Sequence, residues 1–290
     1  MLATLKEVLE KAEQGNYAVG AFNCTSLESG MAIVETAEEL NSPVILQYAD
    51  SHRHLISIDV IGPIMLQLAK IAKVPVVVHL DHGASIESCR HAVDMGFTSV
   101  MYDASAKPFE DNVAETRNVV EYAHERGASV EAELGHILTS KAGAAEGNGK
   151  SYTREEAYTD PEMAKEFIER TNVDALAIGF GTAHGIYTEK PVLDLNRIAL
   201  IKSAKDIPYV MHGGSGLSEE EYRTAIHNGI RKINYYTYLS LAGGRGVMQD
   251  LEEKKDKDAI YFEDIAKAGI TAMKADVKRA MKIFESDGKI

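Results

Sequence analysis

Three histidines, each followed directly by a glycine, are the residues of this chain best suited to bind a metal. They are His82, His184 and His212. Three histidines with an open fourth position form a typical catalytic zinc site. Asp81 immediately precedes His82 at the end of an apolar run, where a carboxylate beside an imidazole is costly without a partner or a metal. These residues predict a metal site in which Asp81 moves a proton.

Other polar residues also follow apolar runs, and their roles are open at this point. Glu133 is a candidate for a further metal ligand or for a residue beside the metal, and Asp103 for a residue that orients a histidine. Either can instead serve only to satisfy a polar interior. His79 precedes His82 by three positions, which places the two on opposite faces of a strand. We therefore expect His79 to be structural or to lie outside the metal ligands.

The glycine-rich segment after His212 has the composition of an anion-binding loop. It reads Gly213-Gly214-Ser215-Gly216-Leu217-Ser218 and opens a predicted helix. Backbone N–H groups at such a helix N-terminus bind phosphate. A second feature, His52-Arg53-His54, has three possible interpretations. It can be a solvated loop, a metal-binding HxH pair, or a segment that contacts the far end of a substrate.

Eight short apolar runs position these residues, and a helical pattern follows each run. The predicted strands are residues 17–23, 43–49, 74–82, 98–105, 129–135, 175–181, 209–214 and 232–237. Strict alternation of strand and helix predicts a parallel sheet, and eight units in 290 residues favour a closed (β/α)8 TIM barrel. No GxGxxG motif follows the first run, which argues against a dinucleotide-binding fold. Active sites of such barrels lie at the C-terminal ends of the strands, where the three histidines fall.

We expect residues 1–290 to form a single α/β domain. A helix at residues 1–14 is predicted to cap the barrel, and helices at 239–286 to form a C-terminal extension. The Gly/Ala-rich segment within residues 136–151 is long for a connection and is predicted to be an active-site loop.

Composition limits the possible partners and the compartment. The net charge of −13 argues against nucleic acid or an anionic membrane as a partner. The two cysteines, Cys24 and Cys89, form no disulfide framework and fit the cytoplasm, and both are expected to be buried or half-buried. No signal peptide and no membrane-spanning apolar run is expected.

Five motifs together resemble a known enzyme family. The segments HLDHGASIESC, VEAELG, GTAHGIY, VMHGGSG and KIN…T, in this order and spacing, are similar to the zinc-dependent class II ketose-bisphosphate aldolases, the fructose- and tagatose-bisphosphate aldolase group. The resemblance extends from about Tyr17 to the C-terminus. It implies Zn²⁺ or another divalent metal, a phosphorylated ketose substrate, a homodimer or homotetramer, and in some members a monovalent cation near the phosphate loop.

The resemblance also implies residue roles. Zinc would bind His82, His184 and His212, and Asp81 would be the acid or base for the C4 hydroxyl of the substrate. Asn23 is a further candidate for substrate binding, at the end of the first predicted strand. Asn234 would contact the dihydroxyacetone-phosphate half of the substrate, and the phosphate would lie against Gly185, Gly213, Gly214, Ser215 and Thr237. Glu133 and Asp103 match acidic positions near the metal.

The chain departs from the family pattern in three places. The loop after the fifth predicted strand has a single acid, Glu146, which we nominate as the base that acts on the dihydroxyacetone-phosphate carbon. Tyr236 stands where the family has a small or polar residue, and Tyr238 where it has an acid or amide. The cation for a second phosphate is not assigned, and the candidates are Arg53, Lys278 and Arg279.

The sequence therefore predicts a metal-dependent aldolase, an aldehyde-lyase of carbohydrate metabolism such as glycolysis. It would cleave a ketose phosphate, such as fructose or tagatose 1,6-bisphosphate, to dihydroxyacetone phosphate and an aldehyde. A Schiff-base mechanism is disfavoured because no lysine ends the sixth strand and Lys232 is expected at the opposite end of the eighth. A metal hydrolase would need HxH where Phe22-Asn23-Cys24 stands. The remaining alternatives are an aldolase for a non-standard ketose 1-phosphate and a non-catalytic sugar-phosphate-binding homologue.

Overall fold

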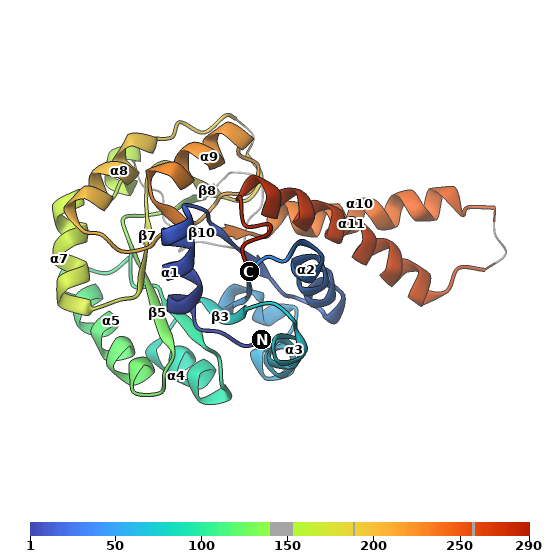
Figure 1. Ribbon diagram of the computed structural model, residues 1–290, viewed down its shortest axis with the longest axis horizontal. Coiled ribbons are helices and arrows are strands. Elements are labelled where there is room, and N and C mark those ends of the chain that lie inside the picture. Colours follow the sequence, from blue (N-terminus) through green and yellow to red (C-terminus); the bar gives the residue numbers. More distant parts are fainter. Residues whose placement is uncertain (140–152, 188, 257–258) are drawn as a thin grey trace.

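The computed structural model describes residues 1–139, 153–187, 189–256 and 259–290. Its centre is a closed barrel of parallel strands in the order β1-β10-β9-β7-β5-β4-β3-β2 (Figure 1). The barrel strands are β1 (Val19–Asn23), β2 (Val44–Ala49), β3 (Val76–Gly83), β4 (Ser99–Tyr102), β5 (Ser129–Leu134), β7 (Ala175–Ile178), β9 (Tyr209–Met211) and β10 (Ile230–Tyr235). Two further short strands, β6 (Leu138–Thr139) and β8 (Ala183–His184), pair with each other. The predicted (β/α)8 TIM barrel is confirmed.

Helices alternate with the strands and surround the barrel (Figure 1). They are α1 (Leu5–Gly15), α2 (Leu27–Leu40), α3 (Ile58–Ile71), α4 (Ile86–Met95), α5 (Phe109–His124), α6 (Arg154–Ala157), α7 (Pro161–Thr171), α8 (Leu195–Ala204), α9 (Glu219–Asn228), α10 (Thr237–Glu253) and α11 (Phe262–Ile283), with a short 3₁₀ helix η1 (Asp50–His54). Ser26, Ser85 and Ser218 begin three of them as N-caps, each accepting a hydrogen bond from a backbone N–H of the first turn.

The barrel interior is apolar at one end and polar at the other. At the amino end of the strands, Ile45, Val77 and Val210 pack with one another and with Leu5 and Leu9 of α1. Helix α1 therefore closes this end, as the sequence predicted for a capping helix. Toward the carboxyl end, the buried residues are polar or charged and include Gln47, His79, Glu131 and Lys232. The polar and charged side chains of the barrel interior therefore gather toward the end where the predicted site lies.

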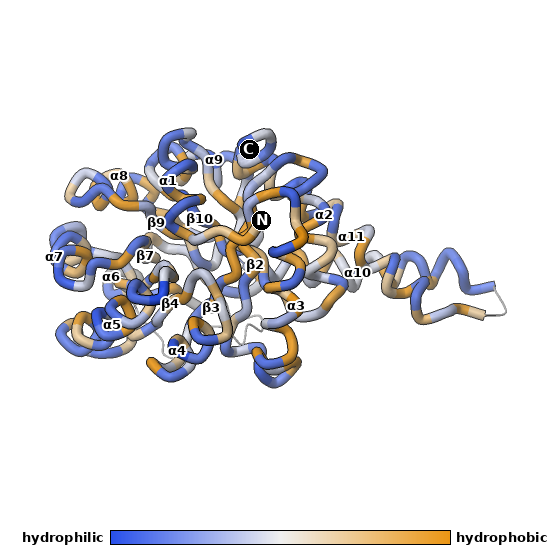
Figure 2. The backbone as a smooth tube through the Cα atoms, turned by 60° about the horizontal axis from the view of Figure 1, so that its bottom comes forward, coloured by the Kyte–Doolittle hydropathy of each residue, from blue (hydrophilic) through white to orange (hydrophobic). Residues whose placement is uncertain are grey.

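The larger apolar core lies between the barrel and its outer helices. Figure 2 shows hydrophobic stretches near β2 at the centre and hydrophilic stretches on outer helices such as α7. Cys24 and Cys89 are both buried here, as predicted, and burial raises the pKa of the Cys24 thiol to about 12. No helix in the described part of the chain is both long and apolar enough to cross a membrane.

The C-terminal helices α10 and α11 form a hairpin that projects from the barrel (Figure 1). Helix α10 begins at Thr237, although the sequence predicted that Thr237 would close the last strand. The end of α11 returns to the barrel, where Val277, Met281 and Phe284 are buried. The backbone N–H of Ala18, just before β1, donates to the Phe284 carbonyl at 3.0 Å. The extension is thus anchored at its base and exposed beyond it.

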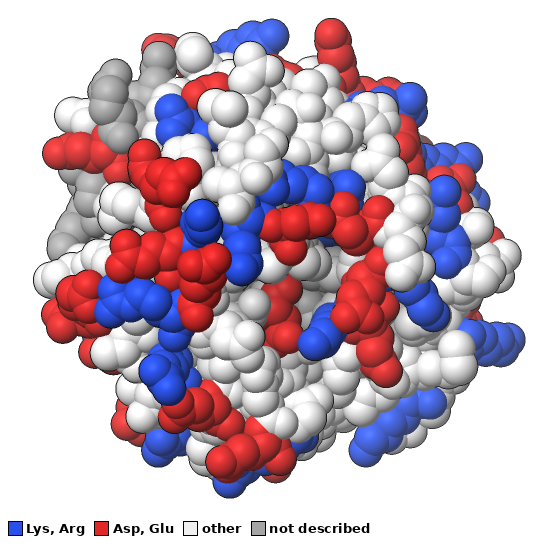
Figure 3. Space-filling view, turned by 60° about the vertical axis from the view of Figure 1, so that its left-hand side comes forward, with Lys and Arg blue, Asp and Glu red and all other residues white. Residues whose placement is uncertain are grey.

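The outer surface carries both signs of charge. On the face in Figure 3, Lys and Arg side chains lie among Asp and Glu side chains. Ion pairs occur elsewhere in the described surface as well, as in the contacts of Arg170 with Glu110 and Glu166. This face therefore has a mixed charge.

Candidate metal centre and active site

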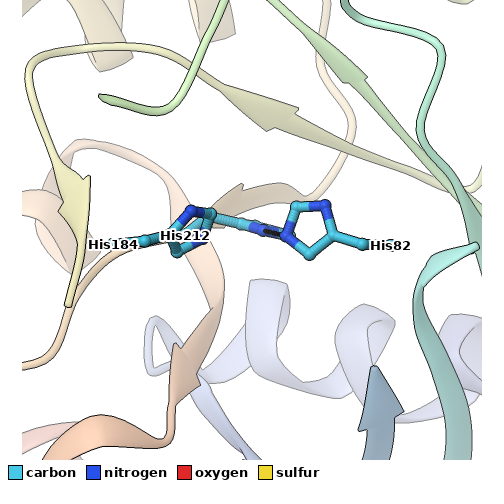
Figure 4. A group of neighbouring side chains, drawn as sticks. All are labelled: His82, His184 and His212. Carbon is cyan, nitrogen blue, oxygen red and sulfur yellow. Dashed lines mark hydrogen bonds between the residues drawn. The ribbon is translucent and has the colours of Figure 1, made fainter. Parts of the chain in front are cut away.

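The imidazoles of His82, His184 and His212 converge at the carboxyl end of the barrel (Figure 4). They come from β3, β8 and the turn after β9, so they reach the site from three directions. A nitrogen of each lies within 4.8 Å of a nitrogen of each of the others. His82 Nε2 and His212 Nδ1 are 2.9 Å apart. The structure therefore brings together the three histidines that the sequence singled out.

The backbone at the end of β3 aims two neighbouring side chains at the same site. His82 has a φ of 45°, a left-handed conformation that is uncommon outside glycine. The register between β3 and β4 also shifts between Leu80 and Gly83. Strand alternation would separate Asp81 and His82 onto opposite faces, but here the His82 Nε2 and Asp81 Oδ1 atoms are 4.0 Å apart. Backbone strain of this kind is typical of functional sites.

Two of the three histidines are held from behind by carboxylates. Asp103 Oδ2 lies 2.9 Å from His82 Nδ1, and Glu131 Oε1 lies 2.8 Å from His212 Nε2. Metal-binding histidines usually have such a partner on the ring nitrogen that faces away from the metal. The sequence analysis anticipated this role for Asp103 but assigned none to Glu131. The available signal was the spacing of Glu131 and Glu133, which puts both on one face of β5.

The donor set fits a divalent metal. Three imidazole nitrogens face a common point, and the two carboxylates fix which nitrogen of His82 and of His212 is turned toward it. Burial lowers the pKa of His82, but the charges of Asp81 and Asp103 raise it by more, to about 10. This pair of acids beside one imidazole stabilises positive charge at the site, whether a proton or a metal supplies it.

Asp81 is buried and receives hydrogen bonds from three side-chain amides. Asn234 Nδ2 donates to Oδ1 at 3.0 Å, while Gln47 Nε2 and Asn23 Nδ2 donate to Oδ2 at 3.2 and 3.4 Å. Burial raises the pKa of Asp81, but several nearby cationic groups, of which His82 contributes most, together outweigh burial and bring the pKa down to about 2. Asp81 is therefore an ionised carboxylate in a fixed orientation at neutral pH. Sequence reasoning missed Gln47 as a contributor, although it lies at the end of a strand.

Glu133 lies in a second group of potential ligands. Its carboxylate is within 4.8 Å of ligand atoms of His82 and Asp103. Its Oε2 atom is buried and has no hydrogen-bond partner among the described residues. Burial, and then the charge of Asp103, raises the pKa of Glu133 well above its usual value. The roles left open for Glu133, a ligand or a residue beside the metal, are both compatible with this position.

A pocket beside the histidines contains most of the residues predicted to bind substrate. Its lining includes Asn23, Asp81, His184, Gly185, Gly213, Ser215, Asn234, Tyr235, Tyr236 and Thr237. Gly214 does not line it, because a side chain at Gly214 would instead point toward Met211 and Ile233. Gly213 has a φ of 63°, and a Cβ atom there would lie 2.6 Å from the carbonyl carbon of Ala183. Only glycine fits at this turn without displacing β8.

Two tyrosines that the sequence analysis did not select hold this pocket together. The Tyr187 hydroxyl donates to the Gly213 carbonyl at 2.7 Å and accepts from the Ala183 backbone N–H at 2.8 Å. The Tyr222 hydroxyl donates to the Gly214 carbonyl. Tyr187 belongs to the GTAHGIY motif, so its position near His184 was a usable signal.

Of the residues at which the chain departs from the family pattern, Tyr236 lines the pocket. The Tyr236 ring packs against the buried His52 ring, with ring centroids 4.6 Å apart. His54 is exposed, and neither His52 nor His54 belongs to a group of potential ligands in the described residues. Tyr238 contacts Gly216, where its ring would block a Cβ atom at 3.0 Å. Glu146 and most of the predicted loop lie outside the described residues.

The candidate cations for a second phosphate are engaged elsewhere. Arg53 lies 3.1 Å from Asp50, and Lys278 lies 3.7 Å from Glu39. Arg279 donates to the Tyr235 hydroxyl at 2.8 Å and to Asp276 at 3.0 Å. None of the three lines the pocket beside the histidines.

Lys232 differs most from its predicted position. The sequence analysis put it at the opposite end of the last strand from the site. In the structure the side chain extends up the barrel interior, and its Nζ lies 2.7 Å from Asn234 Oδ1 and 2.8 Å from Glu131 Oε2. A long side chain can cross the height of two residues in a strand. Lys232 thus lies beneath the active site, where it is ion-paired with Glu131.

Comparisons with known proteins identify relatives along almost the whole chain. The family model "Fructose-bisphosphate aldolase class-II" matches residues 3–289. A fructose-bisphosphate aldolase from Geobacillus stearothermophilus is 41% identical over 99% of this chain and 98% of that protein. The uncharacterized protein YdjI from Escherichia coli K12 is 37% identical over 100% and 99% of the two chains.

Solved structures show the same likeness. The crystal structure of the YdjI aldolase from Escherichia coli K12 superposes with a TM-score of 0.85 at 35% identity, covering 100% of this chain and 99% of that one. A putative fructose-1,6-bisphosphate aldolase from Coccidioides immitis gives a TM-score of 0.83 at 27% identity, over 98% and 97% of the chains. The chain therefore belongs to the class II fructose-bisphosphate aldolase family, a family of carbon–carbon lyases.

Proposed function

We propose that this protein is a metal-dependent aldolase that reversibly cleaves a ketose phosphate, such as fructose or tagatose 1,6-bisphosphate, to dihydroxyacetone phosphate and an aldehyde. The observation that supports this most is the convergence of three histidines beside an ionised, buried Asp81, in one pocket with Gly213 and Ser215. His82, His184 and His212 would hold the metal, which we propose is zinc.

The chemistry divides between the metal and the side chains. When bound, a divalent metal supplies a Lewis acid for the negative charge that develops on the ketose oxygen. Asp81 takes the proton of the C4 hydroxyl, whose O–H electron pair forms the aldehyde carbonyl while the C3–C4 bond breaks and leaves its pair on C3. The three amides around Asp81 hold its carboxylate in place for this transfer. Asn23 and Asn234 would also orient the substrate, and Glu146 would exchange the proton at C3.

The phosphate of the dihydroxyacetone-phosphate half would lie against the turn after β9 and the start of α10. Gly185, Gly213, Ser215 and Thr237 line the pocket there, and Thr237 opens a helix whose N-terminus favours an anion. Gly214 would contribute backbone only. We also propose that a monovalent cation can bind near this turn.

A second candidate substrate is a non-standard ketose 1-phosphate. It is favoured because Arg53 and Lys278 pair with acids and Arg279 donates to the Tyr235 hydroxyl, while none of the three cations lines the pocket. In that case the His52–Tyr236 contact would lie near the end of the substrate that lacks a phosphate.

The cellular setting is part of the same proposal. Two buried free cysteines support a cytoplasmic protein, and the net charge of −13 supports one that binds neither nucleic acid nor membrane. The exposed Met248, Tyr261 and Phe262 of the C-terminal hairpin support a homodimer or homotetramer.

A retro-aldol assay on a panel of ketose mono- and bisphosphates tests the function. We expect turnover of at least one substrate with zinc-loaded protein, and loss of turnover after exhaustive chelation that zinc restores. An undiminished rate after chelation would contradict the metal mechanism. Background turnover across the whole panel despite bound zinc would instead support a non-catalytic sugar-phosphate-binding protein.

A further inference from the structure

Lys232 is a buried cation beneath the active site that the proposed reaction does not use. Its side chain is fully buried within the barrel, on β10. Its Nζ lies 2.8 Å from Glu131 Oε2 on β5 and 2.7 Å from Asn234 Oδ1, two residues further along its own strand. One ammonium group therefore contacts two different parts of the active site.

We propose that Lys232 is a positioning residue that sets both the metal-facing nitrogen of His212 and the amide orientation of Asn234. This inference rests on the proposed metal-dependent aldolase function. It assigns no chemical step to Lys232 itself, because among the described residues its Nζ contacts the site through Glu131 and Asn234.

The first contact acts through Glu131. An ionised carboxylate only accepts hydrogen bonds, and Glu131 Oε1 lies 2.8 Å from His212 Nε2. The proton of a neutral His212 is therefore on Nε2, and the lone pair is on Nδ1, which faces His82 Nε2 at 2.9 Å. Lys232 keeps the carboxylate in this position, because an unpaired buried charge would otherwise be strongly disfavoured.

The second contact acts through Asn234. An ammonium group only donates, so it requires the oxygen of the amide on its side. The amide nitrogen then faces the opposite way, where it donates to Asp81 Oδ1 at 3.0 Å. Without Lys232 the amide could flip and turn its oxygen toward the carboxylate of Asp81. If Lys232 served only to neutralise the charge of Glu131, its contact with the Asn234 amide would have no explanation.

The variant Lys232→Met tests the proposal, because methionine is similar in length and uncharged. We expect its zinc affinity, measured by competition with a colorimetric chelator, to fall about 10- to 100-fold, as for other partners of metal ligands. We expect kcat to fall by about 10²-fold, within the range for a misplaced acid or base, with KM changing much less. The matched control is Lys205→Met, a partly exposed lysine paired with Glu169 on the outer surface.

A double variant separates positioning from simple charge balance. Lys232→Met/Glu131→Gln removes both buried charges, so it should recover thermal stability and provides the measurement if Lys232→Met alone fails to fold. We expect its kcat to remain low, because Asn234 is still unoriented. Full recovery of kcat in the double variant would overturn the proposal. So would a zinc affinity and a kcat of Lys232→Met that both lie within twofold of the Lys205→Met control.

Two further measurements keep this test independent of the assigned reaction. Nitrogen-15 NMR of histidine-labelled, metal-free protein should show a protonated Nε2 at His212 in the wild type and a mixture of tautomers in Lys232→Met. If the wild type binds zinc but turns over no ketose phosphate, the proposed function fails, while the tautomer and zinc affinity still decide the role of Lys232. An unchanged tautomer in Lys232→Met would contradict the inference.

Discussion

Asp103 holds the His82 imidazole from behind, with its Oδ2 2.9 Å from His82 Nδ1. Burial raises the pKa of Asp103, but the hydrogen bond from His82, the charge of His82 and the hydrogen bonds from Ser105 together lower it by more, so the carboxyl is ionised. The opposite ring nitrogen, Nε2, is thereby turned toward His212. The relationship makes Asp103 a determinant of metal affinity, although Asp103 follows β4 and the three histidines come from β3, β8 and the turn after β9.

We expect Asp103→Ala to weaken zinc binding by about 10- to 100-fold, because the His82 ring loses the partner that fixes its orientation. Chelator competition measures the affinity directly. Asp111→Ala, an exposed acid at the start of α5, is the matched control and should bind zinc like the wild type. Equal affinities for the two variants would contradict the role of Asp103.

We expect Asp81→Asn to lower kcat for ketose-phosphate cleavage by about 10²- to 10⁴-fold, because an amide cannot take the proton of the C4 hydroxyl. The side chain keeps its shape, so zinc should remain bound at one ion per chain. Metal analysis of the purified variant provides this control. A kcat within threefold of the wild type would assign the proton transfer to another residue.

The depressed pKa of Asp81 makes the metal-free protein sensitive to acid. Its value of about 2 in the folded state lies below the ordinary 3.8, so the ionised form stabilises the fold at pH values above about 4. This contribution, on the order of 2 kcal/mol, is lost as the pH falls from about 4 to about 2. Denaturant unfolding in the presence of a chelator should show the loss in the wild type. In Asp81→Asn the free energy of unfolding should decline less over the same pH interval, by that amount. Equal declines in the two proteins would argue against the lowered pKa of Asp81.

We expect Gly213→Ala to destabilise the protein by about 1–3 kcal/mol, because alanine is strained at positive φ and its Cβ would collide with the backbone of Ala183. The displaced turn should also raise KM for the ketose phosphate. Gly244→Ala is the control, since a Cβ there meets nothing within 4 Å in helix α10. It should be neutral or stabilising by about 0.5–1 kcal/mol. Thermal unfolding of both variants decides between these outcomes.

The sequence alone determined the barrel and most of the residues at its carboxyl end. Alternating apolar runs and helical patterns specify parallel strands, and the ends of parallel strands meet at one edge. His82, His184 and His212 therefore had to approach one another, wherever the intervening helices lay. Asn23, Asp81 and Asn234 followed from the same rule, because each ends or nearly ends a strand.

The tertiary structure decided what lies behind these residues. The pairing of Glu131 with His212 depends on the register of β5, β7 and β9, which no local pattern contains. The contacts of Lys232 with Glu131 and Asn234 depend on the conformation of its side chain within the barrel. The contact of His52 with Tyr236 joins segments that follow β2 and β10, the two strands on either side of β1. Sequence patterns report which face of an element is buried, whereas hydrogen bonds between elements depend on atomic positions that only the closed barrel sets.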